Sequence, residues 1–331
     1  MARLILQEII DIPTPSCHAT TVARVSGETL MCWFGGTRES DGDVDIYMAR
    51  RKAHGWEKPF LIAGEKDLPH WNPVLFAQGE NVALYYKVGP KVTQWYTRAM
   101  FSEDGAKSFS APYDLVPGDI GGRGPVKNKP IVLESGRMVA GASLETETAW
   151  DAFADLSDDG GKTFRHSAFV PLWRGGEKPA ENARLITEIG AHPGEGKGVI
   201  QPTLWEDENG VHMLLRSSCG EILRSDSVDE GETWCCAYGT GMPNNNSGID
   251  LAQTENGDLW LCANPVAENW GARTPLSLLV SHDNGETFER VMDLETAPGE
   301  YSYPAILAQE GKLFISYTWN REKVAYCEVE L

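Results

Sequence analysis

The eight residues SDDGGKTF at positions 157–164 decide the fold, because the same pattern recurs along the chain. Three further segments share its Ser-x-Asp-x-Gly-x-Thr-aromatic order: SEDGAKSF at 102–109, SVDEGETW at 227–234 and SHDNGETF at 281–288. The first of these departs from it, with Ala106 at the Gly position and Ser108 at the Thr position. The four serines are 55, 70 and 54 residues apart, and such regular self-similarity indicates a repeat architecture.

The residue types in this pattern are those of a tight turn between two strands. An Asp side chain accepts backbone N–H bonds within its own turn, Gly takes a positive φ, and Ser and Thr hydroxyls close the loop. The aromatic residue then packs beneath neighbouring strands. Residues 211–215 and 276–280, which precede the last two copies, alternate or run apolar as strands do. We therefore expect each copy to lie on a β-hairpin.

The spacing of the copies predicts the number of units. A degenerate fifth copy, ARRKAHGW at 49–56, keeps the spacing, one glycine and the aromatic residue. A period near 54 residues divides the 331 residues into about six units. The longer gap of 70 residues then holds one unit plus a loop insertion at about 174–197, rich in Gly, Pro and Glu.

Six four-stranded units arranged radially make a β-propeller, which protects its sheet edges by repetition. The sequence therefore predicts an all-β, six-bladed β-propeller that occupies residues 1–331 as a single domain. A β-solenoid is the alternative, but its repeats are shorter than about 50 residues. The strand near 4–10 is expected to pair with the C-terminal strands at 313–319 and 324–330 and to close the ring.

The composition excludes several classes of partner. Asp and Glu total 48 against 29 Lys and Arg, a net charge of −19, so a nucleic-acid partner is not expected. No apolar run approaches the ~20 residues of a membrane span, and the N-terminus lacks a signal-peptide pattern, so we expect a cytoplasmic protein. The seven cysteines have no zinc-ligand spacing, and neither a metal nor a cofactor is predicted. The oligomeric state is left open.

Several segments besides the turns carry a resemblance to a known family. The repeated turns resemble the Asp boxes of the sialidase (neuraminidase) superfamily of six-bladed propellers, and in particular its branch with BNR repeats. The other segments are WFGGTRE (33–39), WNPVLF (71–76), GPVKNKP (124–130), GVIQPTLWE (198–206), NSGID (246–250), RTPLSL (273–278) and GEYSYPAI (299–306). The resemblance covers essentially the whole chain and implies activity on a sugar of a glycan.

The resemblance also implies a set of site residues. Sialidases use a tyrosine nucleophile activated by a glutamate, an aspartate acid/base, and three arginines that bind the substrate carboxylate. In this chain it implies Tyr301, in GEYSYP, as the tyrosine and Asp41 as the acid/base. It implies Arg216 and Arg273 as the second and third arginines, and Glu206 as a further glutamate of the family.

Two positions depart from the family pattern. Gln201 stands where the activating glutamate is expected, and SCHAT at 16–20 stands where the first arginine is expected. A glutamine cannot take a proton from a phenol, and a neutral tyrosine is a poor nucleophile. The missing arginine removes a bidentate clamp for a carboxylate. His18 in this segment is either a base or acid in that corner or a strand histidine with satisfied hydrogen bonds.

An acidic cluster follows the first unit's second strand. Arg38 precedes Asp41, Asp43 and Asp45 in a segment that is either a charged hairpin surface or part of a site. Clustered carboxylates raise one another's pKa, which a general acid requires. We therefore expect Asp41 to act as an acid and Asp45 to pair with an arginine.

The loop GGRGPVKNKP at 121–130 concentrates cations in an acidic protein. Arg123, Lys127 and Lys129 lie among glycines there, and we expect this loop to bind a carboxylate or sulfate of the substrate. Asn246 and Asp250 in NSGID form either a polar turn or a set of hydrogen-bond partners for sugar hydroxyls.

The first functional hypothesis is a sialidase-like exo-glycoside hydrolase that acts on an acidic sugar, of the sialic or uronic acid type, in a glycan. Tyr301 would attack or stabilise the anomeric centre and Asp41 would protonate the leaving oxygen. The carboxylate would be held by Arg38, Arg216 and Arg273. Glycoside hydrolysis usually needs two carboxylates, and a tyrosine nucleophile is a recognised exception.

Two other functions are compatible with the same residues. A polysaccharide lyase would eliminate across a uronic acid, with His18 or Tyr301 as base and acid and Arg123 or Arg216 neutralising the carboxylate. This chemistry tolerates Gln201 because no glycosyl-enzyme forms. A propeller that binds glycans without chemistry is the third hypothesis.

Overall fold

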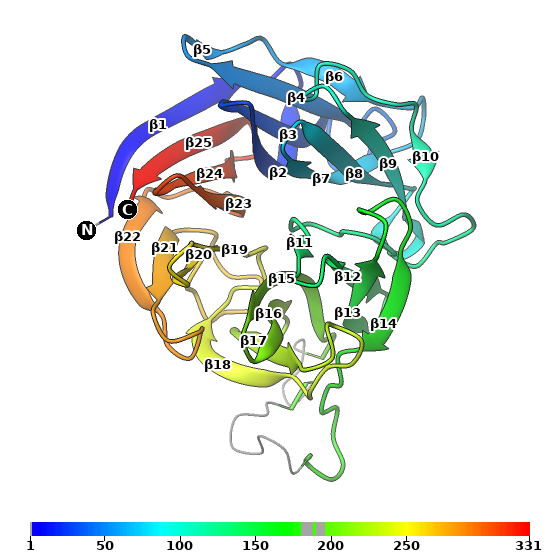
Figure 1. Ribbon diagram of the computed structural model, residues 1–331, viewed down its shortest axis with the longest axis vertical. Coiled ribbons are helices and arrows are strands. Elements are labelled where there is room, and N and C mark those ends of the chain that lie inside the picture. Colours follow the sequence, from blue (N-terminus) through cyan, green and yellow to red (C-terminus); the bar gives the residue numbers. More distant parts are fainter. Residues whose placement is uncertain (1, 180–187, 190–195) are drawn as a thin grey trace.

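The computed structural model describes residues 2–179, 188–189 and 196–331, and their strands form six antiparallel sheets around one axis (Figure 1). This all-β architecture is a six-bladed β-propeller, so the predicted fold class is confirmed. Most of the insertion predicted at 174–197 lies outside the described residues. The sheets are called blades 1 to 6 in chain order, counted from the sheet that contains β2.

The strand bounds are as follows, with the innermost strand of each blade first. Blade 1 contains β2 (Ser16–Val25), β3 (Glu28–Gly36), β4 (Asp45–Lys52), β5 (Gly55–Trp56) and β6 (Phe60–Ala63), and blade 2 contains β7 (His70–Gln78), β8 (Asn81–Val88), β9 (Tyr96–Ser102) and β10 (Tyr113–Asp114). Blade 3 contains β11 (Ile131–Val132), β12 (Met138–Glu145), β13 (Trp150–Ser157) and β14 (Arg165–Phe169), and blade 4 contains β15 (Val199–Asp207), β16 (Gly210–Ser217), β17 (Glu221–Ser227) and β18 (Tyr238–Pro243). Blade 5 contains β19 (Asp250–Gln253), β20 (Leu259–Ala263), β21 (Leu276–Ser281) and β22 (Glu289–Glu295), and blade 6 contains β23 (Tyr301–Gln309), β24 (Lys312–Trp319), β25 (Lys323–Glu330) and β1 (Arg3–Asp11). A short 3-10 helix, η1 (Val92–Gln94), precedes β9.

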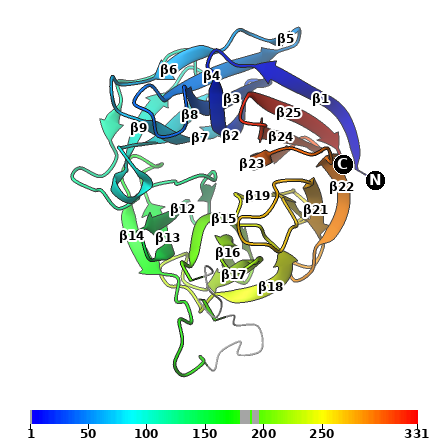
Figure 2. The ribbon, with the colours of Figure 1, turned by 180° about the vertical axis from the view of Figure 1, so that it is seen from behind.

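Blade 6 is built from both ends of the chain and closes the ring. β1 pairs antiparallel with β25, from Arg3 opposite Glu330 to Asp11 opposite Lys323. The two termini lie side by side in both views (Figures 1 and 2). The expected pairing of the N-terminal strand with the C-terminal strands is therefore confirmed, and the ring cannot open without breaking this ladder.

The four repeated turns connect the third and fourth strands of blades 2 to 5. In blade 4 the Ser227 hydroxyl accepts a hydrogen bond from the Gly231 N–H at 2.9 Å. Asp229 accepts the N–H of Thr233 at 2.9 Å and its hydroxyl at 2.6 Å. The same contacts occur in the other three copies. Because every contact stays within one turn, a short sequence pattern is enough to specify it.

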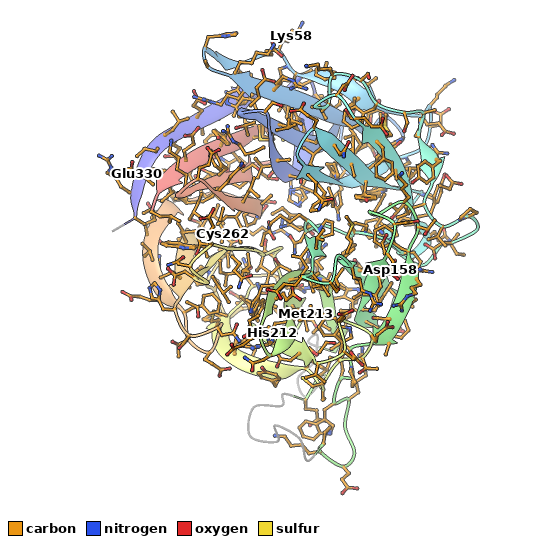
Figure 3. The ribbon with its side chains drawn as sticks, viewed as in Figure 1. Lys58, Asp158, His212, Met213, Cys262 and Glu330 are labelled. Carbon is orange, nitrogen blue, oxygen red and sulfur yellow. The ribbon has the colours of Figure 1, made fainter. Side chains whose placement is uncertain are left out.

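Each repeated turn also packs against the preceding blade. The Tyr85 hydroxyl of blade 2 donates to the Gly161 carbonyl of the blade 3 turn at 2.9 Å. Gly161 has a φ of +85°, and a Cβ there would lie 2.2 Å from that hydroxyl, so this position requires glycine. Buried side chains such as Met213 and Cys262 fill the spaces between neighbouring sheets (Figure 3).

The innermost strands bulge at equivalent places around the axis. In blades 1, 2, 4 and 6 the register shifts near residues with a positive φ: Ala19 (55°), Asn72 (33°), Gln201 (54°) and Tyr303 (52°). In blades 2, 4 and 6 the bulged residue precedes a proline. A positive φ is unfavourable for residues other than glycine, so neighbouring groups must hold these bulges. A bulge re-aims the side chain that it carries, and this positions the residues described next.

Candidate functional site

Arg216 stands at the centre of a group of polar side chains beside the axis. Its side chain extends from the end of β16 and is 3% exposed. Its Nε donates to Asn246 Oδ1 at 2.8 Å, and its Nη1 donates to Gln201 Oε1 at 3.0 Å and to the Tyr303 hydroxyl at 2.6 Å. All three partners are neutral, and Arg216 forms no ion pair within the described part of the chain. The hydrogen-bond partners of this buried positive charge therefore supply no countercharge.

Two more arginines belong to this region, from blades 5 and 6. The guanidinium carbon of Arg273 is 5.6 Å from the centroid of the Tyr303 ring, and Arg321 approaches His18. Arg273 Nη1 and Arg321 Nε both donate to the same oxygen of Glu300, each at 2.8 Å. Arg321 Nη1 also pairs with Glu39, which comes from the loop between β3 and β4. Burial alone would raise the pKa of Glu300, but the two guanidinium groups outweigh burial and lower it. Both arginines thus already carry a carboxylate partner, in contrast to Arg216.

His18 lies against this group in the bulge of β2. Its ring centroid is 4.1 Å from that of Tyr303, and its Nε2 is 3.5 Å from Arg321 Nη2. Nδ1 lies 3.0 Å from the Thr318 hydroxyl. Burial, and then the charges of Arg321, Arg273 and Arg216, lower the pKa of His18 well below its ordinary value. The imidazole is therefore neutral at physiological pH. We call His18, Gln201, Arg216, Arg273, Tyr303 and Arg321 the axial cluster.

The tyrosine of the axial cluster is Tyr303, whereas the sequence points to Tyr301. Tyr301 belongs to a hydrophobic cluster between blades 5 and 6, and its ring centroid lies 6.3 Å from that of Trp319. In a regular strand the two tyrosines would face the same side. The bulge between Ser302 and Ala305 breaks this alternation and turns Tyr303 alone toward Arg216.

The loop between β3 and β4 contributes a different carboxylate from the expected one. Arg38 is largely exposed and pairs with Asp41, three residues along the same loop, at 3.2 Å. Glu39, not Asp41 or Arg38, joins the axial cluster through Arg321. Asp45 does not pair with an arginine in the described residues; it lies 3.8 Å from the His70 ring.

Glu206 lies far from the axial cluster. It is five residues beyond Gln201 on β15, or roughly 16 Å along a strand. Its carboxylate accepts the backbone N–H of Glu134 at 2.9 Å. The structure therefore does not place Glu206 beside the tyrosine.

The cationic side chains of the loop at 121–130 bind groups of the protein itself. Arg123 binds both oxygens of the buried Asp155, at 2.8 and 3.0 Å. Lys129 binds both oxygens of Asp250, at 3.0 and 3.2 Å, and the Leu251 carbonyl at 2.7 Å. The expectation that Arg123 and Lys129 hold a substrate anion is thus corrected, because protein carboxylates already neutralise them. The same contacts withdraw Asp250 from sugar hydroxyls.

Sequence reasoning missed several residues around the axial cluster. A sequence pattern could have identified Tyr303, because an X-Pro pair marks three equivalent bulges: Asn-Pro at 72–73, Gln-Pro at 201–202 and Tyr-Pro at 303–304. Arg321 lies in the turn between β24 and β25, where the local sequence has no distinguishing pattern. Two tryptophan rings, Trp150 and the 61% exposed Trp270, each lie 5.8 Å from the Arg216 guanidinium carbon.

Glu145 is a further carboxyl group close to Arg216. It ends β12 directly opposite Trp150, and it is 7% exposed. Burial raises its pKa to about 7, against the opposing charges of Arg216 and Lys87. The Ser143 hydroxyl donates to it at 3.4 Å. Around neutral pH Glu145 is thus partly protonated and only partly compensates the cations near it.

Two hollows in the described structure lie away from the axial cluster. One, of about 430 Å³, lies at the far ends of the inner strands and is lined mainly by 22–27, 75–80 and 307–309. The other, of about 670 Å³, is lined by acidic residues that include Asp41 and Asp43. Neither hollow is lined by a residue of the axial cluster.

Residues 2–179, 188–189 and 196–331 contain no group of three or more His, Cys, Asp or Glu side chains arranged to hold a metal ion. In the same described residues, no helix has the length and apolar character needed to cross a membrane.

Comparison with solved structures identifies similar propellers. A protein of unknown function from Dyadobacter fermentans matches with a TM-score of 0.74 and 15% identity, over 100% of this chain and 99% of that chain. A Trypanosoma rangeli sialidase in complex with sialic acid matches with a TM-score of 0.71 and 14% identity, over 99% of this chain and 57% of that chain. The K499G mutant of NanB sialidase from Streptococcus pneumoniae matches with a TM-score of 0.73 and 12% identity, over 98% and 70%.

At these identities the similarity establishes a sialidase-like propeller fold, and this chain spans little more than half of the Trypanosoma rangeli protein. A search of curated proteins finds no match. The family model for the BNR repeat-like domain matches residues 27–315, which is most of the chain and includes all four repeated turns. The chain therefore belongs to the BNR repeat-like domain family.

Proposed function

We propose that this protein binds a carboxylate-bearing sugar of a glycan at the axial cluster and hydrolyses its glycosidic bond. The observation that carries the proposal is the buried guanidinium of Arg216, whose hydrogen-bond partners are all neutral. An unpaired buried charge costs several kcal/mol, and an anionic ligand would supply the countercharge. Arg273 and Arg321 belong to the same cluster, but Glu300 and Glu39 already neutralise them, so Arg216 is the cation that a ligand would meet.

In the proposed hydrolysis Tyr303 lies against the anomeric carbon. Arg216 donates to its hydroxyl oxygen and so stabilises the phenolate, which forms when the phenol proton passes to water. The phenolate bonds the anomeric carbon as the glycosidic C–O bond breaks, and water then cleaves the tyrosine–sugar bond. Glu39, the carboxyl group of the β3–β4 loop that reaches the axial cluster through Arg321, protonates the leaving oxygen. The shared fold with sialidases, one of them solved with sialic acid, supports a sugar acid as the ligand.

A second candidate reaction, elimination across a uronic acid, is favoured by two contacts of Tyr303. The neutral His18 lies 4.1 Å from the Tyr303 ring, and Tyr303 meets the amide of Gln201 and not a carboxylate. His18 would take the proton next to the carboxylate, the C–O bond would break as a C=C bond forms, and Tyr303 would protonate the leaving oxygen. The arginines would neutralise the carboxylate and so make that proton more acidic.

One assay separates these possibilities. Purified protein is incubated with a panel of sialosides and uronosides, and both reducing-sugar release and near-ultraviolet absorbance are followed. Hydrolysis gives a new reducing end without absorbance, whereas elimination gives an unsaturated, absorbing product. If neither product forms but calorimetry shows binding of the free acidic sugar, the protein is a glycan-binding propeller. If the sugar does not bind, the assignment of the axial cluster as an anion site fails.

A further inference from the structure

The segment GPVKNKP at 124–130 takes an unusual course in blade 3. In the other five blades the innermost strand has four to ten residues, whereas β11 has only Ile131 and Val132. The residues before β11 lie among the inner strands of the neighbouring blades. The Val126 N–H donates to the Gly141 carbonyl at 3.1 Å, and the Val126 carbonyl accepts the side-chain amide of Asn72 at 3.0 Å. This segment thus already holds the bulge of blade 2.

Lys127 reaches from the same segment to blades 5 and 6. Its side chain is 2% exposed, and its Nζ donates to the carbonyls of Ile249, at 3.0 Å, and Pro304. Pro304 directly follows Tyr303, so this contact fixes the backbone of the blade 6 bulge. Lys127 Nζ is 6.0 Å from the centroid of the Tyr303 ring.

Gly248 allows Lys127 and Tyr303 to approach each other. A Cβ at Gly248 would lie 3.2 Å from Lys127 Cε and 3.3 Å from Tyr303 Cδ2. Both distances are tighter than ordinary contact, so the lysine stem and the tyrosine ring pack against a backbone with no side chain between them. The orientation of Tyr303 therefore depends on Lys127 through packing as well as through the hydrogen bond to Pro304.

Asn128 holds the backbone of the bulge in blade 4. Its side-chain amide donates to the carbonyls of Gln201 and Pro202, both at 3.0 Å. One segment therefore contacts all three bulges that combine a positive φ with a following proline, at Asn72, Gln201 and Tyr303. Two of these residues hydrogen-bond Arg216 directly.

We propose that residues 124–130 form a central strap in which Lys127 is a positioning residue for Tyr303 and Asn128 is a positioning residue for Gln201. Each side chain holds a strained bulge in the conformation that presents the bulged residue to Arg216. The strap thereby links the geometry of the axial cluster to a segment that contributes no group to the ligand. This inference rests on the proposed function, because positioning matters for activity only if Tyr303 acts on a ligand.

The test is Lys127→Met, which keeps the unbranched stem of the side chain but lacks the terminal ammonium group and its donors. The matched control is Arg50→Met. Arg50 is also a buried cation that donates to two backbone carbonyls of a neighbouring blade, those of Gly105 and Ala106, but it does so away from the axis. Crystal structures of both variants are expected to show Tyr303 released from Arg216 in Lys127→Met and unmoved in Arg50→Met.

A kinetic cycle with Tyr303→Phe provides the second readout. Lys127→Met is expected to lower kcat by about 10²-fold with little change in KM, because a displaced reacting group slows the chemistry rather than ground-state binding. Since Lys127 acts through Tyr303, adding Lys127→Met to Tyr303→Phe should cause no further loss. A merely structural role would instead lower the melting temperature and leave the kcat of the folded fraction unchanged.

The proposal is overturned if Tyr303 keeps its contact with Arg216 in the Lys127→Met crystal, or if the losses from the two substitutions multiply. If Lys127→Met does not fold, Asn128→Ala is examined in the same way, with release of Gln201 from Arg216 as the expected result and retention as the contradicting one. If the wild-type protein turns over no substrate, the proposed function fails, and the crystallographic comparison still decides the positioning role.

Discussion

The repeated turns and the axial cluster are built by opposite rules. In a turn the contacts that set its shape are local, as when the Gly231 N–H donates to the hydroxyl of Ser227, four residues earlier. In the axial cluster Arg216 contacts partners 15, 30 and 87 residues away in the chain, on blade 4, between blades 4 and 5, and on blade 6. The turns can be copied from blade to blade with little change, whereas blades 1, 4, 5 and 6 contribute different side chains to the centre. The periphery thus fixes the fold, and substitutions at the centre can change the chemistry without disturbing the fold.

Arg216→Met tests whether the axial cluster binds an anion. A ligand carboxylate loses its main partner, so the affinity for a free acidic sugar should fall by about 10²- to 10³-fold. The free energy of unfolding should stay the same or rise, because the variant no longer buries an unpaired charge. Isothermal titration calorimetry and urea unfolding give the two values. An unchanged affinity would show that the anion binds elsewhere.

Glu145→Gln tests whether a titrating group lies inside the centre. The pKa of Glu145 is about 7 in the folded protein against an ordinary 4.5, so folding favours its protonated form. The stability of the wild-type protein should therefore fall as pH rises from about 4.5 to 7, while the variant lacks this loss. The free energy of unfolding of the wild-type protein should fall by about 3 kcal/mol over this pH range, relative to that of the variant. Urea unfolding of both proteins at pH 5 and pH 8 measures this loss. The prediction is contradicted if the wild-type protein and the variant differ in unfolding free energy by the same amount at both pH values.

Gln201→Glu sharpens the role of the neutral partners. The introduced carboxylate would lie beside Arg216 and compete with the ligand, so the affinity for an acidic sugar should fall by about 10- to 100-fold. The melting temperature should rise, because the buried charge gains a countercharge. Affinity should recover at low pH, where the introduced group is protonated. Gln201→Met serves as the uncharged control, and tighter binding by the Glu variant would refute this reading.

Asp283→Ala tests the repeated turns, through the copy at 281–288. The Thr287 hydroxyl, more than burial or the backbone, holds the pKa of Asp283 at about 2. Since this is below the ordinary value, the stabilisation is present above about pH 4 and is lost as pH falls toward 2. The group is exposed, so the variant should lose only about 1 kcal/mol at neutral pH, with no change in ligand affinity. A change in affinity would show that the turns and the centre are coupled.

The fold could be predicted because its signal is local. SDDGGKTF specifies a turn through contacts inside eight residues, and the spacing of its copies gives the number of blades. Blade 1 lacks the side chains of the turn, yet the period still places it. Closure by the N-terminal strand followed from the same count.

The site was less predictable because its geometry depends on bulges and on contacts between blades. A single bulge at 302–305 puts Tyr303 and not Tyr301 beside Arg216, and alternation along a strand cannot show this. Arg321 comes to His18 from the other end of the chain, 303 positions away. The cationic loop resembled an anion site because the sequence does not show that Asp155 and Asp250 already neutralise it.

The most direct test of the account is a crystal structure of the wild-type protein with a bound acidic monosaccharide, such as glucuronate. The account predicts that the ligand carboxylate lies about 3 Å from the Arg216 guanidinium, with its ring next to Tyr303 and His18. A carboxylate found on the loop of Arg123 and Lys129, or a ligand bound only outside the axial cluster, would contradict it.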